Sequence, residues 1–435
     1  MGHLIPLTEL AHRLLLHRRL FITFIIPTAA GSPIKPQNDI LNAMPENISS
    51  IFLPPVDLND IPEEAGLAAR ISLTLTRSLP ALRQTLTKLT SESIRNRPST
   101  LIVDFFGPPS FEVAEEFNIP VYMFCTVSAM TLVIVFLTPA LDEMYACEYK
   151  DVPEPVRLHG CAPFHGADMA EPLQDKKNPT YIRMVEAAKK FSMPKGILVN
   201  SFLELEPGPF KAMEEGEWCK PKVYPVGPLI RSGSENQTGE GFECLKWLDK
   251  HPVGSVLFVS FGSGGTLSQQ QLNELAFGLE KSGQRFIWVM KSPHGKSDAS
   301  YFNAQSHLDP FEFLPEGFLG RVEDRGLVVS SWAPQVKILS HGSTGAFLTH
   351  CEWNSILECL VCGVPMIAWP LFVEQKMNAV LGTDGLGVAR RVKVDENGVI
   401  GRDRGGPNVG WGVARATAQL FFGSVKFYFF FRFLY

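Results

Sequence analysis

Short apolar runs alternate with amphipathic segments through the second half of the chain. Runs with the length and composition of buried strands occupy residues 254–262, 286–290, 327–332, 346–350 and 365–370. Segments with helical spacing of apolar positions occupy residues 268–283, 354–363 and 374–382. This alternation predicts a mainly parallel sheet covered by helices, which is a doubly wound α/β unit.

The first half has a looser version of the same pattern. Its apolar runs occupy residues 20–27, 49–55, 101–106, 120–126 and 196–201, and residues 111–117 form an amphipathic segment. Residues 231–241 are polar and rich in glycine, as in a linker. We therefore predict a domain at 1–230, a linker at 231–241 and a second domain at 242–400, two Rossmann-like units facing a cleft. In open α/β sheets, ligands bind outside the carboxyl ends of the strands.

Composition narrows the class of protein without naming a function. The chain has 435 residues, 45% of them hydrophobic and 20% charged, and its net charge is −5. These values are typical of a soluble globular protein and give no electrostatic reason to expect nucleic acid. Eight irregularly spaced cysteines do not make a disulfide framework, which favours a reducing compartment. No secretory signal or membrane span is evident, so we expect a cytoplasmic protein, and we expect a monomer.

The carboxyl-terminal end of the chain is unusual. Residues 401–435 lack any helical or strand period and finish in the aromatic stretch FFGSVKFYFFFRFLY. We interpret this segment as an aberrant tail rather than a normal domain end.

Polar residues gather where the run at 346–350 ends. His350 closes that run, Asn354 and Ser355 follow, and Ser355 with Glu358 fits a capping box. A helix start directly after a strand presents unpaired amide donors and a positive dipole end. We infer an anion site, for which a diphosphate is the best candidate. A capped helix with no ligand is the structural alternative.

Two other strand ends and one glycine-rich turn carry candidate ligand contacts. Trp332 ends the run at 327–332, and Glu374 and Gln375 follow the run at 365–370. Ser263 lies in SFGSGG, which could touch the same diphosphate or be a simple tight turn. That turn lacks the third glycine of a dinucleotide fingerprint, which argues against an NAD-dependent dehydrogenase. An aromatic ring, a phosphate site and a carboxylate–amide pair would suit a base, a diphosphate and a sugar.

Residues 332–375, WAPQVKILSHGSTGAFLTHCEWNSILECLVCGVPMIAWPLFVEQ, resemble the plant secondary-product glycosyltransferase box of UDP-dependent glycosyltransferases. The stretches MGHLIPLTELAHRL, LIVDFFG and ILVNSFLELEP resemble the same family, and SFGSGGTLSQQQLNELAFGLE with MKSPHG resembles its hydroquinone and monolignol glucosyltransferase branch. The resemblance covers about residues 1 to 400. It implies a GT-B fold and an inverting, metal-free transfer in which UDP-glucose is a co-substrate and no cofactor is bound.

The resemblance also implies a role for individual residues. Trp332 would stack on uracil, and Ala333 would bond it through backbone atoms. Gln335 and Glu358 would hold the ribose hydroxyls. The diphosphate would be bound by His350, Asn354 and Ser355, in agreement with the anion site inferred above. Trp353, Glu374 and Gln375 would hold the sugar, and a final glutamine fits glucose.

The acceptor side depends, by the same resemblance, on His3 and Asp104. His3 would take the proton of a small phenolic acceptor, and Asp104 would orient and stabilise the charged imidazole. The family begins with a strand that precedes this histidine, so we expect the first strand to be missing, a gap in the sheet, and His3 on a frayed end.

Glu352 departs from the family pattern, which has glycine at this position. Glycine suits a tight turn and a close approach of the backbone to phosphate. Glutamate would bring a like charge towards the diphosphate or strain the turn, and either effect would weaken donor binding. We therefore expect a glucosyltransferase whose activity is low in this chain. The alternative is a catalytically impaired UDP-sugar-binding protein or pseudogene product.

Overall fold

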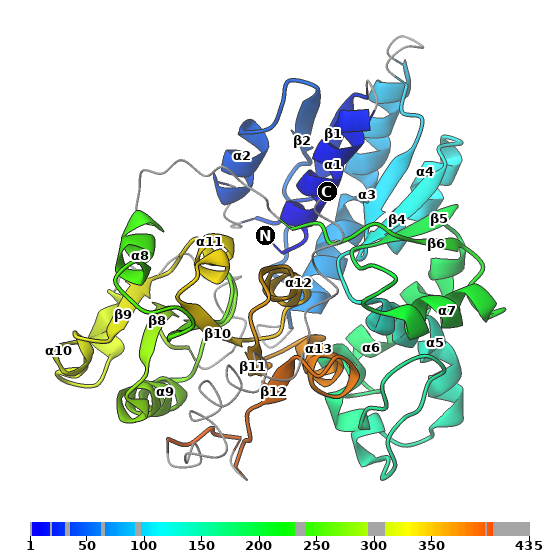
Figure 1. The fold of residues 1–435 in the computed structure, drawn as a ribbon. Coiled ribbons are helices and arrows are strands. Elements are labelled where there is room, and N and C mark those ends of the chain that lie inside the picture. Colours follow the sequence, from blue (N-terminus) through cyan, green and yellow to red (C-terminus); the bar gives the residue numbers. More distant parts are fainter. Residues whose placement is uncertain are drawn as a thin grey trace. The chain divides into compact units, whose positions relative to one another are not determined.

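Every ladder between named strands in the computed structural model is parallel. The strands belong to two compact units, Met1–Arg231 and Ser232–Tyr435 (Figure 1). The structure describes residues 2–17, 20–30, 35–61, 66–91, 97–230, 241–294, 309–395 and 398–402. The predicted linker, apart from Gly241, and the tail beyond residue 402 lie outside the described residues.

The first unit has two separate sheets. The strands β1 (Ile22–Ile26) and β2 (Ile48–Phe52) pair with each other, and β3 (Leu101–Asp104), β4 (Val121–Cys125), β5 (Gly196–Val199) and β6 (Lys222–Pro225) form the second sheet in that order. Among the described residues no ladder joins β1 to β3. The carboxyl end of β3 is Asp104, so this residue lies at the sheet edge where ligands of α/β folds bind.

Helices cover both faces of the four-stranded sheet. The helices of this unit are α1 (Leu4–His17), α2 (Lys35–Asn42), α3 (Leu67–Ser91), α4 (Phe111–Glu116), α5 (Ala129–Met144), α6 (Pro179–Lys189) and α7 (Pro207–Glu215). Apolar residues of α3, α4, α5 and α7 pack with β3, β4 and β5 in one core cluster. On the other face, Leu7, Leu10 and Leu14 of α1 pack against Phe124 of β4. Their i, i+3, i+7 spacing gives α1 one apolar stripe, which fixes its amino-terminal end beside β3.

A buried carboxylate completes the start of α5. Glu206 is 2% exposed, and its two oxygens accept hydrogen bonds from the amides of Ala129 and Met130, each at 2.9 Å. The Ser201 hydroxyl also donates to Glu206. Burial raises the pKa of the Glu206 carboxyl, and these hydrogen bonds oppose that rise. Helix starts leave amides without intrahelical partners, so Glu206 satisfies groups that would otherwise be buried and unpaired.

The second unit contains one six-stranded sheet. Its order is β12-β11-β10-β7-β8-β9 (Figure 1). The strands are β7 (Val256–Ser260), β8 (Arg285–Met290), β9 (Gly326–Ser330), β10 (Thr344–Thr349), β11 (Met366–Ala368) and β12 (Ala389–Arg391). The chain builds outwards in one direction from β7 and in the other from β10, so the topological switch point lies between these two neighbouring strands.

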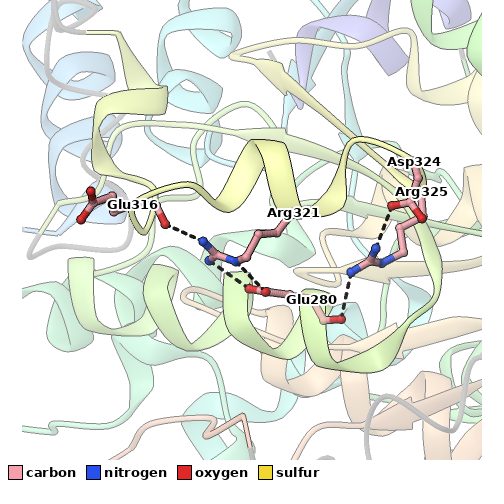
Figure 2. Close-up of polar contacts among 5 residues, drawn as sticks. All are labelled: Glu280, Glu316, Arg321, Asp324 and Arg325. Carbon is pink, nitrogen blue, oxygen red and sulfur yellow. Dashed lines mark hydrogen bonds and ion pairs between the residues drawn. The ribbon is translucent and has the colours of Figure 1, made fainter.

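The helices of the second unit are α8 (Gly241–Leu248), α9 (Gln269–Ser282), α10 (Phe318–Val322), α11 (Gln335–Ser340), α12 (Trp353–Cys362) and α13 (Gln375–Val380). Leucines of α9 pack on the sheet together with Phe318 of α10. Arg321 of α10 also donates to both carboxylate oxygens of Glu280 on α9, at 2.7 and 3.1 Å (Figure 2). A bidentate pair of this kind sets the orientation of the short helix α10.

Replacing Glu206 tests its role at the start of α5. Glu206→Ala leaves two buried amides without acceptors, so we expect a loss of about 3 kcal/mol in the free energy of unfolding. The measurement is the midpoint of urea unfolding followed by circular dichroism. Glu204→Ala, at an exposed position two residues earlier, is the matched control and should stay within about 0.5 kcal/mol of wild type. Equal midpoints for the two variants would contradict this account of α5.

Candidate functional site

Three loops at the carboxyl ends of the second sheet contain strained backbone. Ser331 after β9, Cys351 after β10 and Val373 after β11 have φ values of 64°, 66° and 47°. A left-handed conformation is uncommon outside glycine, and a β-branched residue such as Val373 is a clear outlier. Such strain concentrates at functional sites, where the surrounding structure enforces it. These loops also carry Trp332, His350 and Glu374, the residues that the sequence singled out.

The start of α12 differs from the sequence prediction. The helix begins at Trp353 with Glu352 as its N-cap, so Ser355 lies within the first turn. The predicted capping box is therefore wrong. Ser355 and Glu358 instead share a partner: Gln335 Nε2 donates to Ser355 Oγ at 3.0 Å and to Glu358 Oε2 at 2.7 Å. Gln335 opens α11, so these bonds join the loop after β9 to α12.

A hydrogen bond likewise connects the loop after β10 to α13, the helix that follows β11. Asn378 of α13 donates its side-chain amide to the Cys351 carbonyl at 3.0 Å. The Gln375 carboxamide oxygen accepts from the amides of Leu371 and Phe372 at 2.8 and 3.1 Å. Glu374 is the N-cap residue of α13 and adjoins Val373. The loops after β9, β10 and β11 are thus joined through α11, α12 and α13.

His350 lies at the switch point and is only 3% exposed. Gly262, in the loop after β7, has a φ of 70°, and a Cβ on it would lie 2.4 Å from His350 Nε2. Only glycine allows this contact, because of both its conformation and the missing side chain. Burial, with the positive charge of Lys291 as a second cause, lowers the pKa of His350 to about 3. His350 Nδ1 is a buried polar atom with no hydrogen-bond partner among the described residues.

The other predicted donor-binding residues differ in exposure. Trp332 is 54% exposed, which leaves its indole open to stacking, whereas Ala333 is 8% exposed. Ser263 is exposed in the loop after β7. Burial raises the pKa of the Glu358 carboxyl to about 7, so it is part protonated at neutral pH.

The Trp353 side chain is buried at the start of α12. The residue is 0% exposed and is among the largest fully buried side chains. It begins α12 with its ring packed in the interior of the second unit, where burial of a large aromatic surface stabilises the helix start. This burial describes the indole ring, and the expectation that Trp353 contacts the sugar stays a prediction.

Glu352 has ordinary backbone geometry. Its φ and ψ are −63° and 142°, which any residue adopts, and the left-handed residue is its neighbour Cys351. The idea that glutamate strains this turn is therefore wrong. The charge effect stays a prediction: Glu352 Oε1 accepts a hydrogen bond from the Asn354 side-chain amide at 3.0 Å. The carboxylate thus engages a donor that we expect to bind the diphosphate.

In the first unit, His3 and Asp104 are in direct contact. His3 Nδ1 lies 2.7 Å from Asp104 Oδ1, and the imidazole stacks on Phe106 with ring centroids 5.2 Å apart. The His3 carbonyl accepts from the Leu7 amide at the start of α1. The expectation that His3 sits on a frayed end is therefore wrong, because the helix, the carboxylate and the aromatic ring all fix it.

Sequence reasoning missed three residues of these sites: Phe106, Gly262 and Lys291. Phe106 belongs to the turn after β3, and Lys291 follows β8 and donates to the Gly262 carbonyl. All three lie just beyond strand ends, and this position is the feature of the sequence from which they could have been predicted.

Among the described residues no group of three or more His, Cys, Asp or Glu side chains could hold a metal ion. No helix in the described ranges has the length and hydropathy that crossing a membrane requires.

Two Rossmann-like units, one with a buried histidine at its switch point and one with a histidine–aspartate pair, are the features of a GT-B glycosyltransferase. Residues 241–395 match the family described as UDP-glucoronosyl and UDP-glucosyl transferase. Hydroquinone glucosyltransferase of Rauvolfia serpentina is 52% identical over 92% of this chain and 85% of its own length. The chain therefore belongs to the plant UDP-dependent glycosyltransferases.

Solved structures agree with this assignment and with the GT-B fold. Phytolacca americana UGT2, complexed with UDP-2fluoro-glucose and pterostilbene, superposes with a TM-score of 0.84 at 44% identity, covering 98% of this chain and 88% of that one. A UDP-glucosyltransferase from Polygonum tinctorium, capable of glucosylating indoxyl, gives a TM-score of 0.86 at 44% identity, covering 97% of this chain and 87% of that one. The fold and class predicted from the sequence are confirmed.

Neutralising Glu352 tests the charge effect at α12. Because the backbone of Glu352 is unstrained, Glu352→Gln and Glu352→Gly should both raise the affinity for UDP-glucose, by about tenfold. Isothermal titration calorimetry of the two variants and wild type gives the dissociation constants. A gain with glycine alone would show that the backbone approach limits binding, and no gain with either would refute the charge effect.

Proposed function

We propose that this enzyme transfers glucose from UDP-glucose to a phenolic hydroxyl of a small plant metabolite, with inversion at the sugar C1. His3 acts as the general base and Asp104 orients it. The observation that carries the proposal is the 2.7 Å contact between His3 Nδ1 and Asp104 Oδ1. With Nδ1–H donated to the carboxylate, the tautomer is set so that Nε2 takes the acceptor proton.

The donor is proposed to lie along the strand ends of the second unit. Uracil stacks on the exposed Trp332 indole and meets the backbone of Ala333, and the ribose hydroxyls meet Gln335 and Glu358. The diphosphate is held by His350, Asn354 and Ser355, with Ser263 nearby, and Trp353, Glu374 and Gln375 hold the sugar. Support comes from the hydrogen bonds that Gln335 donates to Ser355 and Glu358. They hold the two proposed ribose contacts, Gln335 and Glu358, next to Ser355, a proposed phosphate contact. The unpartnered, buried Nδ1 of His350 adds a donor for an anion.

The transfer follows as one displacement. His3 Nε2 removes the proton from the acceptor hydroxyl while the oxygen attacks the glucose C1. The bond from C1 to the diphosphate oxygen breaks, and UDP leaves with the bonding electrons. Backbone amides at the start of α12 and neutral His350 stabilise the charge that develops on the leaving diphosphate. Asp104 stabilises the imidazolium that forms on His3.

An aromatic acceptor is favoured by the surroundings of His3. Phe106 stacks on the imidazole at 5.2 Å with an angle of 21° between the rings, and Phe105 packs edge-on against Phe106. These rings present an apolar surface beside the base, which suits the body of a phenol. A phenolic hydroxyl is also acidic enough for a histidine base to deprotonate as attack begins. The names of relatives that act on hydroquinone or bind pterostilbene point the same way.

Replacing His3 and Asp104 tests the base assignment. At saturating UDP-glucose with hydroquinone as acceptor, His3→Ala should lower kcat about a thousandfold, and Asp104→Asn roughly a hundredfold. The dissociation constant for UDP-glucose should not change, because neither residue belongs to the donor site. His159→Ala removes a histidine whose side chain is 79% exposed and is the matched control. Full activity in His3→Ala would overturn the proposal, and donor binding without any turnover of phenols would favour the binding-protein alternative.

The pH dependence of uridine binding tests Glu358. A ribose hydroxyl donates to a carboxylate, so the ionised form of Glu358 is the binding form. Because its pKa is about 7, affinity should fall as pH drops, by up to about tenfold between pH 8 and pH 6. His350 cannot cause this change, since its pKa of about 3 keeps it neutral throughout. Uridine titrations of wild type and Glu358→Gln are the measurement. The variant should bind weakly and without pH dependence, and an equal pH dependence in both proteins would exclude Glu358.

A further inference from the structure

Lys291 connects two neighbouring strand ends of the second sheet. It follows β8 directly, and its Nζ donates to the Gly262 carbonyl in the loop after β7 at 2.5 Å. The adjacent Met290 carbonyl accepts from the Ser331 amide at 2.8 Å, at the turn that leads to Trp332. The end of β8 thus contacts the loops that follow the strands on both of its sides, β7 and β9.

The loop that Lys291 holds is the one that abuts His350. Gly262 adopts a left-handed conformation, and its Cα faces the His350 ring so closely that a Cβ would lie 2.4 Å from Nε2. The Gly262 amide donates to Ser260 Oγ at 3.3 Å, so both polar groups of this residue have partners within the unit. Lys291, Gly262 and His350 therefore form one cluster at the switch point, which we call the Lys291 cluster.

The Lys291 cluster contains a positive charge without a counter-ion. In the described part of the chain no carboxylate pairs with Lys291, and the titratable group that interacts with it is His350, which stays neutral. Burial lowers the pKa of the Lys291 ammonium to about 8, as expected where the charged form is not compensated. A desolvated cation gains most from an anion placed next to it. The anion site at His350 and the first turn of α12 provides such a place.

We propose that Lys291 is a positioning residue for the donor diphosphate, which holds the Gly262 loop against His350 and supplies the positive charge that balances the phosphates. This inference rests on the proposed donor site. It adds a residue outside the stretch 332–375 that carries the family resemblance. It also explains why the cation at the end of β8 bonds a carbonyl oxygen and not a carboxylate among the described residues.

Calorimetric titration of UDP-glucose and of uridine into three proteins tests the proposal. Lys291→Met should lower the affinity for UDP-glucose about tenfold or more and leave uridine binding unchanged, because uridine carries no phosphate. Lys291→Arg keeps the charge and should bind UDP-glucose within about threefold of wild type. Lys281→Met, at an exposed position of α9, is the control for loss of a lysine elsewhere.

Proton uptake separates the charge effect from a purely structural one. At about pH 8.5 Lys291 is mostly neutral before binding, and a bound diphosphate raises its pKa, so wild type should take up part of a proton with each UDP-glucose. Titrations in buffers of different ionisation enthalpy measure this uptake, which should be absent in Lys291→Arg and Lys291→Met.

Either of two results would overturn the role of Lys291 while leaving the proposed donor site intact. These are equal weakening of uridine and UDP-glucose binding in Lys291→Met, and proton uptake unchanged in both variants. Failure of the wild-type chain to bind UDP-glucose would overturn this proposal and the donor site together.

Discussion

The contact between Gly262 and His350 constrains the rest of the proposed donor site. It joins the loops after β7 and β10, the two strands at which the sheet changes direction, and it is possible only because Gly262 has no side chain and a φ of 70°. The contact buries the imidazole and keeps it neutral, so His350 is suited to donate a hydrogen bond rather than to carry charge. Positive charge then has to come from elsewhere, and Lys291 is the cation in contact with the same loop.

The proposed chemistry is divided between the two units. The second unit presents donors, an exposed indole and a carboxylate–amide pair in loops that also contain strained residues. Hydrogen bonds join α11 to α12 and α13 to Cys351 in the loop after β10. The first unit presents His3, the proposed base, fixed by a carboxylate, a helix and an aromatic ring. Both sites lie at carboxyl ends of parallel strands, as the general rule for α/β sheets predicts. We expect the charge of Glu352 to oppose this arrangement, because its carboxylate engages Asn354, a proposed diphosphate contact.

The sequence predicted the strands well where apolar runs were long and bounded by turns. The run at 254–262 contains β7, and the run at 286–290 covers β8 except for its first residue, Arg285. The short edge strands β6 and β12 lack such a run and were missed. The predicted helix at 354–363 was nearly right, but its start was misplaced because Ser355 and Glu358 have capping-box spacing while their actual partner, Gln335, is distant in sequence. The role of Trp353 came from the family resemblance, and the burial of its ring could not be predicted from spacing, which does not reveal which way a side chain faces. Gly262 and Lys291 act only through contacts between strand ends, which no local pattern encodes.

A crystal structure of the protein with UDP bound tests the central claim most directly. The account predicts uracil stacked on the Trp332 indole, ribose hydroxyls within hydrogen-bond distance of Gln335 and Glu358, and the diphosphate within about 3 Å of a His350 ring nitrogen and the first amides of α12. A nucleotide bound elsewhere on the second unit, or a diphosphate with no contact to His350 or to the start of α12, would contradict it.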